Sequence, residues 1–192
     1  RPKKPGMSDG RGRDACFNEP GGICCGKDGK IYVVDRENHC LRTVSPQGVV
    51  QSVCGTNGES GFREGRARQA LFKRPFGITV SPSDGTLFVC DSGNDAVRRV
   101  NAETYEVETA FAGSLNTPVG VAIDGQNCLY VSEWGGHQIR RIQPDGSSVV
   151  CLGSSQRGKL DGRGQHAQLF SPAGLAWDAR GNQLFIADFG NH

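Results

Sequence analysis

The sequence of 192 residues lacks the features that mark several protein classes. No apolar run approaches the roughly 18 residues that a membrane span requires. The net charge of +2 is too small to demand a nucleic acid or a membrane surface as partner. There is no Gly-x-Ser-x-Gly elbow, no phosphate-binding loop and no H-E-x-x-H motif. The sequence therefore offers no familiar catalytic constellation, cofactor site or small-molecule substrate site.

Glycine, in contrast, is abundant, and it accompanies an internal repeat. The 28 glycines are about twice the average usage, which predicts many tight turns and short strands. Four units each open with a Pro-x-Gly step, then carry an apolar run that ends in an acid, a short loop and further apolar runs. The apolar runs are IYVVD (31–35), LFVCD (87–91), LYVSE (129–133) and LFIAD (184–188). Self-similarity at about 42 to 56 residues, with four short strands per unit, predicts the blades of a β-propeller.

The repeated residues resemble those of a known family. Pro-x-Gly-Ile, then Tyr-Val-x-Asp, then Asn-His is similar to the NHL repeat, over roughly residues 9–192. Leaders DGRGRDACFNEP (9–20) and DGRGQHAQLFSP (161–172), and a weaker EGRARQALFKRP (64–75), resemble the Asp-Gly-x-Gly-x-x-Ala-x-Phe leader of one NHL branch. The third unit departs from the pattern, with Glu133 for Asp, Gly136 for Asn and no leader. The resemblance implies an all-β, NHL-type β-propeller.

The repeat also predicts the domain organisation. We expect a leader without strands over 1–19 and a propeller over 20–192. Its blades should span about 20–55, 75–113, 118–153 and, in part, 172–192. NHL-like propellers usually close with six blades, so the resemblance implies an incomplete ring of about three and a half blades. We therefore expect a piece of a longer protein, or a ring that another chain completes.

The connections predict where binding residues lie. In a four-stranded meander, the loop after the second strand and the link to the next blade share one end of the sheet. The long links at 56–74 and 154–171 therefore mark a candidate interaction face, because binding often resides on long loops of a rigid scaffold. The predicted face comprises Arg11, Arg13, Arg63, Arg66, Arg68, Trp134, Arg157, Lys159 and Arg163.

The recurring polar residues have structural interpretations. The acids are expected to accept backbone N–H bonds in turns, and the asparagines to occupy left-handed positions, where Gly136 substitutes naturally. A catalytic acid would seldom recur in every blade. The predicted turn residues are Asp35, Asn38, Asp91, Asn94, Glu133, Asp188 and Asn191. The recurring Arg42, Arg98 and Arg140 are expected to cover apolar surface and pair with a carboxylate; phosphate binding is the alternative.

His39, His137 and His192 share one slot, which Asp95 fills in the second unit. Such a set suggests a metal site, as in lyases on similar propellers. Equivalent points on adjacent blades should, however, be more than about 10 Å apart, whereas zinc needs ligands within about 2.1 Å. We therefore predict no metal site and no cofactor, and interpret these residues as turn or packing residues.

The eight cysteines are an even number, which allows four disulfides in a secreted protein. The repeat argues otherwise, because cysteine alternates with small or apolar residues in equivalent slots. Cys90 shares its slot with Val34, Ser132 and Ala187. Cys24 and Cys54 behave likewise, which is typical of buried free thiols. A reducing, cytoplasmic location is therefore predicted. Secretion is the alternative, because a secretory signal peptide could precede Arg1.

Together these observations favour a non-catalytic protein–protein interaction scaffold, for example a structural subunit of a larger assembly. Single-stranded RNA binding is the alternative, as NHL domains of tripartite-motif ubiquitin ligases suggest, but it needs exposed aromatics on a positive face. A metal-dependent lyase or lactonase is the third hypothesis. It lacks a repeated set of carboxylates or histidines near the innermost strands, where Cys24, Thr79, Ala122 and Ala176 lie.

Overall fold

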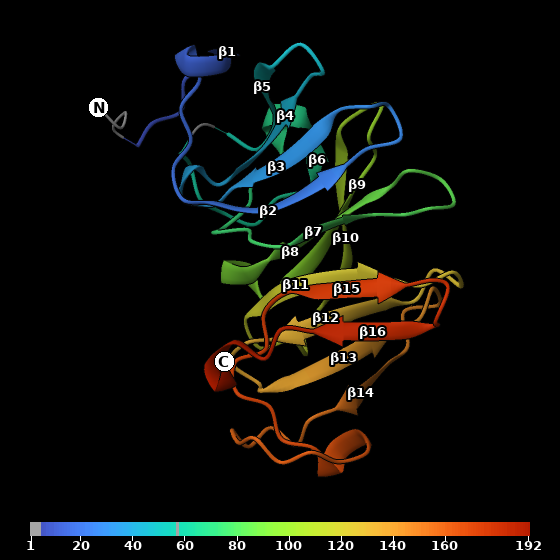
Figure 1. Ribbon diagram of the computed structural model, residues 1–192. Helices are drawn as coiled ribbons and strands as arrows, with labels where there is room; N and C mark the ends of the chain where they lie inside the picture. The colour runs from blue at the N-terminus through green and yellow to red at the C-terminus, as the bar shows by residue number, and fades with distance from the viewer. Residues whose placement is uncertain (1–4, 57) are drawn as a thin grey trace.

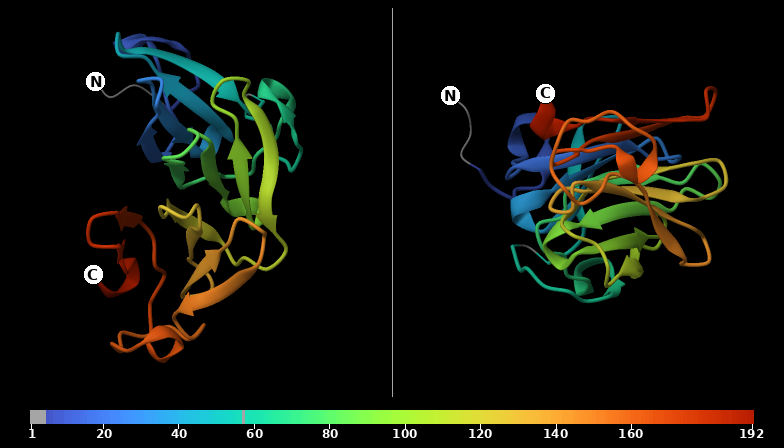
Figure 2. Two further views of the ribbon diagram at one scale, coloured as in Figure 1. Left: turned by 90° about the vertical axis from the view of Figure 1, so that its right-hand side faces the viewer. Right: turned by 90° about the horizontal axis from the view of Figure 1, so that it is seen from below.

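The computed structural model describes residues 5–56 and 58–192, which form consecutive antiparallel β-sheets. Figure 1 shows the N-terminal sheet at the top and the third and fourth sheets below it, where the fourth overlaps the third in this view. Seen from the side in Figure 2, they follow an arc. The first strands of neighbouring sheets contact one another, so they form the inner side of this arc.

The first sheet is a four-stranded meander with a fifth strand added from the leader. Its order is β1-β5-β4-β3-β2. In β1, Gly10 pairs with Val50 and Arg11 with Val49. The prediction that residues 1–19 hold no strand is therefore wrong, because the leader adds to the outer edge of the blade that follows it. The strands are β1 (Gly10–Arg11), β2 (Pro20–Cys25), β3 (Ile31–Asp35), β4 (Cys40–Val44) and β5 (Val49–Cys54).

The second sheet repeats this arrangement, with the order β6-β10-β9-β8-β7. Its leader strand β6 pairs with β10, where Gly65 lies opposite Val107. The second leader thus takes the same place as the first. The strands are β6 (Gly65–Arg66), β7 (Ile78–Val80), β8 (Leu87–Asp91), β9 (Ala96–Val100) and β10 (Glu106–Ala112).

The third and fourth sheets have fewer strands in the described residues. The third has the order β11-β12-β13-β14, so β14 is its edge and carries no leader strand within 5–56 and 58–192. The fourth is a hairpin of two strands, which ends near the C-terminus. The strands are β11 (Pro118–Ile123), β12 (Leu129–Glu133), β13 (Gln138–Ile142), β14 (Ser148–Leu152), β15 (Leu175–Asp178) and β16 (Gln183–Ile186).

Short 3-10 helices occur at two kinds of place. One set turns the leaders back toward the first strand of a blade: η1 (Gly12–Asp14), η3 (Ala67–Gln69) and η5 (Gly164–His166). The other set follows the second strand of a blade: η2 (Arg36–Asn38), η4 (Ser92–Asn94) and η6 (Phe189–Asn191).

The hydrophobic core lies between adjacent sheets. One cluster joins the first two sheets and includes Tyr32, Phe72 and Leu87; a second joins the next pair and includes Val97 and Val131. The second strand of a blade is apolar on both faces because each face packs against a neighbouring sheet. In the third sheet, which has no leader, Leu115 joins the core.

The glycine of the Pro-x-Gly step permits close contact between inner strands. The N–H of Gly22 donates to the carbonyl of Phe76 in the next sheet at 2.7 Å. A Cβ atom on Gly22 would lie 2.8 Å from that oxygen, and the carbonyl of Val119 blocks a Cβ on Gly77 in the same way. The repeated glycine is therefore required where blades meet.

These features confirm an all-β fold of the propeller type. The sheets do not close into a ring within the described residues, in agreement with the predicted incomplete propeller. Among the same residues, no helix has the length and apolar character needed to cross a membrane.

Candidate interaction face

The loops after the second strand of each blade are held by one repeated network. An acid oxygen accepts the backbone N–H that lies two residues before the proline of the same blade. The bonds are Asn18 to Asp35, Lys73 to Asp91 and Phe170 to Asp188, each 2.8 Å, and Asn116 to Glu133, 3.0 Å. The acids thus fix where the chain enters each first strand.

The second oxygen of the acid accepts a bond from an asparagine, which also bonds to the segment that enters the blade. Asn38 donates from Nδ2 to Asp35 Oδ2 and to the carbonyl of Gly6, both at 2.8 Å. Asn94 and Asn191 make the same pair of bonds, to Asp91 and Asp188 and to the carbonyls of Gly61 and Gly158, which lie just before the leaders. The asparagines therefore do more than complete a turn, because they connect the loop to the incoming leader.

The left-handed position lies one residue later than the sequence pattern predicted. The asparagines are the last residues of the 3-10 helices, whereas His39, Asp95 and His137 have φ of 55°, 48° and 52°. Asn38, Asn94 and Asn191 are consequently not the left-handed residues.

This histidine slot joins neighbouring blades. His39 Nδ1 accepts the backbone N–H of Arg74 at 3.1 Å, and His137 Nδ1 accepts that of Ser171 at 3.1 Å. In the second blade, Asp95 Oδ1 accepts the N–H of Thr117 at 2.7 Å. The slot thus requires an acceptor, which explains why aspartate replaces histidine there.

The recurring arginines lie at the centre of the same network. Arg42 and Arg98 are fully buried and pair with Asp35 at 2.7 Å and Asp91 at 3.1 Å. Burial raises the pKa of Asp91, and hydrogen bonds from Asn94, Lys73 and Arg98 oppose that rise. Arg42 also donates to the carbonyls of Ser8 and Cys16. The predicted pairing with a carboxylate is confirmed. The side chains of Arg42 and Arg98, however, are buried in the interior and do not cover apolar residues at the surface.

The slots that vary between blades surround a hollow on the inner side of the loops. Three slots differ in every blade: the residue after the acid, the residue before the proline and the residue after the proline. The slot after the acid contributes Arg36, Ser92, Trp134 and Phe189. The slot before the proline contributes Arg74 and Thr117, and the slot after the proline contributes Phe76, Val119 and Ala173. These residues, with Gly93 and Asp95, line a volume of about 660 Å³, which we call the axial hollow.

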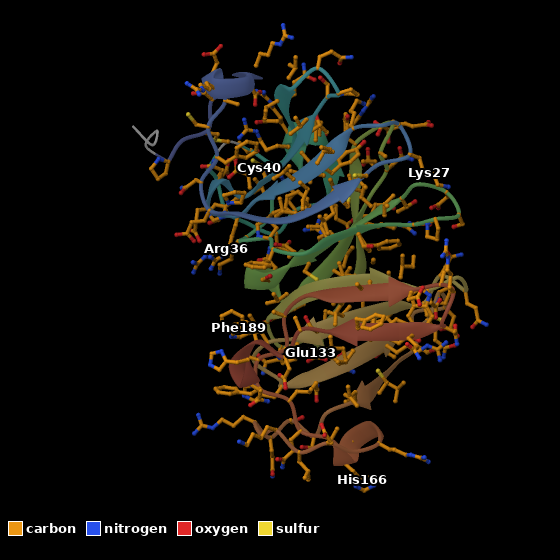
Figure 3. All side chains as sticks on the ribbon, in the orientation of Figure 1. Lys27, Arg36, Cys40, Glu133, His166 and Phe189 are labelled. Atoms are coloured by element: carbon orange, nitrogen blue, oxygen red, sulfur yellow. The ribbon has the colours of Figure 1, made fainter. Side chains whose placement is uncertain are left out.

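Aromatic and basic groups meet in the axial hollow. Trp134 and Phe189 lie with ring centroids 5.0 Å apart, and the Arg36 guanidinium lies 5.7 Å from the centre of the Phe76 ring. Phe189 is 63% exposed. Arg36 and Phe189 lie on the same side of the molecule in Figure 3, and Lys27 lies on the opposite side.

The predicted interaction face is not one patch. Of its nine residues, only Trp134 lines the axial hollow, and Trp134 is half-buried rather than exposed. Arg11 and Arg66 donate to carbonyls of Gln47 and Thr104, in hairpins at the other end of the sheets. We expected the leaders to lie at the same end of the sheets as the loops after the second strands. This is wrong for Arg11 and Arg66, because the leader first runs along the outer strand of its blade to the other end of the sheet. Arg13, Arg63, Arg68, Arg157, Lys159 and Arg163 lie on the leaders and the long links around the rim.

Sequence comparison identifies the repeat. The NHL repeat model matches residues 17–44. NHL repeat-containing protein 2 of Gallus gallus is 28% identical over 97% of this chain and 32% of the relative, and the Homo sapiens protein is 26% identical over 98% and 32%. The chain contains an NHL repeat. Protein SUPPRESSOR OF QUENCHING 1, chloroplastic, of Arabidopsis thaliana is 33% identical over 54% of the NHL chain and 10% of its own length.

Solved structures share the fold of the NHL chain at low identity. A chain of a nidogen/laminin complex has a TM-score of 0.69 at 20% identity, covering 91% of this chain and 59% of that one. A streptogramin B lyase has a TM-score of 0.65 at 14% identity, with 91% and 50% covered. These similarities show the propeller fold alone. The NHL chain spans about a third of the length of the NHL repeat-containing protein 2 relatives.

The NHL chain holds its cysteines as free thiols. All eight are unpaired; Cys40, Cys54, Cys90 and Cys128 are buried, and Cys25 is exposed. Burial raises the pKa of Cys40 to about 12, and it raises that of Cys54 and Cys90 as well. In the described residues, no three His, Cys, Asp or Glu side chains are grouped so that they could hold a metal ion.

Proposed function

We propose that this NHL chain is a non-catalytic protein interaction module that binds a protein partner at the axial hollow. One observation carries the proposal: the slots that build the frame hold the same or a chemically similar residue in most blades, whereas three of the slots that line the hollow differ in every blade. A scaffold needs the same residue in every blade, but recognition of one partner surface needs different residues around the axis.

The residue types at the hollow suit a protein partner. Tryptophan and arginine are enriched among residues that dominate binding energy in protein interfaces. Trp134, Phe189 and Phe76 offer apolar area, and Arg36 and Arg74 surround it with polar groups. The two arginines are neutralised, since Arg36 pairs with Glu19 at 2.8 Å and Arg74 with Glu37 at 2.7 Å.

Single-stranded RNA is the second candidate ligand. The paired rings of Trp134 and Phe189 beside Arg36 have the chemistry on which bases stack. The acids beside both arginines reduce the positive potential that a phosphate backbone requires, so we favour a protein. An RNA mobility assay at low salt separates the two, and a salt-sensitive shift lost in Trp134→Ala would support RNA.

Structural neighbours include a lyase and gluconolactonases, but their low identity carries no activity to this chain. Asp95 is the one carboxylate among the described residues that line the axial hollow, and it is engaged by the Thr117 N–H. We therefore propose an interaction role within a multi-subunit complex. We also infer a reducing, cytoplasmic location from the free thiols.

Comparative affinity capture with single-site variants tests the proposal. Trp134→Ala should abolish recovery of a stoichiometric partner that wild type retains, because it removes the largest side chain of the hollow. Trp177→Ala is the matched control, since Trp177 stacks on Tyr130 at 5.4 Å and does not line the axial hollow. Equal recovery with both variants would refute the proposal.

A further inference from the structure

The two described leader strands show how a peptide adds to a blade edge. Asp9 Oδ1 accepts bonds from Ser52 Oγ at 3.0 Å and from Arg42 Nη2 at 2.8 Å, and the following Gly10 pairs with Val50. In the second sheet, Glu64 Oε1 accepts the backbone N–H of Thr109 at 2.8 Å. Each acid-Gly-Arg segment thus combines strand pairing with a carboxylate contact.

The third sheet presents the same edge without a leader. Val150 pairs with Arg140 as Thr109 pairs with Arg98 and Ser52 with Arg42, so the edge positions correspond. By this register the N–H of Val150 faces outward. The neighbouring Val149 is 53% exposed. Among the described residues, the exposed Gln165 side chain donates to the Val150 carbonyl at 3.3 Å, and no strand pairs with this edge.

The third arginine also has spare donor capacity. Arg140 uses Nε for Glu133 at 2.7 Å and Nη1 for Ser148 at 3.4 Å. In the first blade, Nη2 of Arg42 donates to the Ser8 carbonyl and to Asp9 Oδ1. In the second blade, Nη2 of Arg98 donates to the carbonyl of Arg63. No bond from Nη2 of Arg140 is present among the described residues, since the third unit has no leader to receive one.

The space that a leader would occupy is open. Gly55 and Gly153 each donate their N–H to a following leader, to Ala67 and Gly164, at 3.2 Å. The equivalent Gly113 has no such partner in the described residues, and nothing lies within 4 Å of where its Cβ would be. Between the second and third sheets, Thr109, Ala110 and Ile142 line a hollow of about 670 Å³.

We propose that the open edge of β14, together with the free N–H of Gly113, binds an extended peptide of a partner protein that carries an acid-Gly-Arg sequence. The peptide adds as a fifth strand to β14, its carboxylate accepts from the Val150 N–H and from Arg140 Nη2, and a carbonyl accepts from Gly113. The leaders on β5 and β10 are the internal precedents. Strand addition gives affinity through main-chain bonds, and the carboxylate gives specificity.

This edge is separate from the axial hollow, so the inference does not depend on the proposed function. Gly113, Arg140 and Val150 are not among the described residues that line the axial hollow, which is formed by the loops that follow the second strands and by residues around each proline. Variants of one surface should leave the other unaffected.

The test uses a fluorescent peptide, LDGRGQHAQLF, which copies residues 160–170 and contains no cysteine. Fluorescence anisotropy with the whole chain should show saturable binding. A peptide with asparagine in place of the aspartate should bind about tenfold more weakly, because it loses the charge-assisted bonds. Absence of saturation, or equal affinity of the two peptides, would overturn the proposal.

Protein variants locate the site. Val150→Pro removes the outward N–H at an edge position where proline is tolerated, and should weaken binding about tenfold or more. Arg140→Lys keeps a charge for Glu133 but loses the second donor, and should weaken binding about fivefold. Arg180→Ala is the matched charge control and should bind as wild type. Unchanged binding by either edge variant, with a folded thermal transition, or loss of binding in Trp134→Ala, contradicts the assignment.

Discussion

His39 Nδ1 accepts the backbone N–H of Arg74 across the boundary between the first and second blades, at 3.1 Å. Arg74 has φ of 46° and directly precedes Pro75, so the bond fixes the chain where it enters the second blade. Asp95 accepts from Thr117 in the same way at the next boundary. This position therefore requires a side chain that accepts a hydrogen bond, and either histidine or aspartate can supply it.

Substitution at this slot should follow acceptor capacity. His39→Ala leaves the Arg74 N–H without its partner and should lower the free energy of unfolding by about 1 kcal/mol. His39→Asp restores an acceptor and should recover most of that loss. Urea unfolding of the three proteins measures the difference. If the alanine and aspartate variants are equally destabilised, the role of the slot as an acceptor is wrong.

The buried and exposed ion pairs of β9 should differ strongly in their effect. Asp91→Ala leaves the fully buried Arg98 without its carboxylate and should cost about 3–5 kcal/mol. Glu108→Ala removes the partner of the adjacent Arg99, where both side chains are about half-exposed, and should cost less than about 1 kcal/mol. Thermal or urea unfolding compares the two. Similar losses would contradict the interior role of Arg98.

The first leader should loosen at acidic pH. Burial raises the pKa of Asp9, but hydrogen bonds from Ser52 and Arg42 outweigh it and hold that pKa below its ordinary value of 3.8. Because the folded pKa is lowered, Asp9 stabilises the fold above about pH 4, and this contribution is lost as the pH falls through the folded value. Asp9→Asn should therefore be less stable than wild type at pH 6, and the difference should shrink toward pH 2. A difference that is constant with pH would refute this linkage.

The cysteines should react according to their burial. The thiolate is the reactive form, and burial raises the pKa of Cys54 and Cys90. Iodoacetamide at neutral pH should label the exposed Cys25 and spare Cys54 and Cys90 until the chain unfolds. Peptide mass spectrometry reads the sites, and denatured protein should show eight reactive thiols. Fast labelling of Cys90 in the folded chain, or a deficit of thiols, would contradict this account.

The repeat in the sequence was sufficient to predict the blades, because each blade meets the same packing problem. The apolar runs 31–35, 87–91 and 129–133 are the strands β3, β8 and β12. The strand in the first leader could not be predicted, since Gly10–Arg11 is only two residues long and two residues carry no periodicity.

The site was harder to predict because it depends on contacts between distant residues. The return path of the leaders moved Arg11 and Arg66 away from Trp134, and no local pattern shows that path. The turn geometry was displaced by one residue, from Asn38 to His39, because Asn38 is engaged by Asp35 and Gly6. One signal was available in the sequence: the slot after each acid, Arg36, Ser92, Trp134 and Phe189, is the loop position at which every blade has a different residue.

The most direct test of the account is hydrogen–deuterium exchange of the chain with and without its captured protein partner. If the axial hollow is the interaction face, protection on binding should concentrate in the loops at 36–39, 92–95 and 134–137 and at the residues before and after each proline. Protection confined to the outer leaders at 9–14 and 64–69, with the axial loops unchanged, would contradict it.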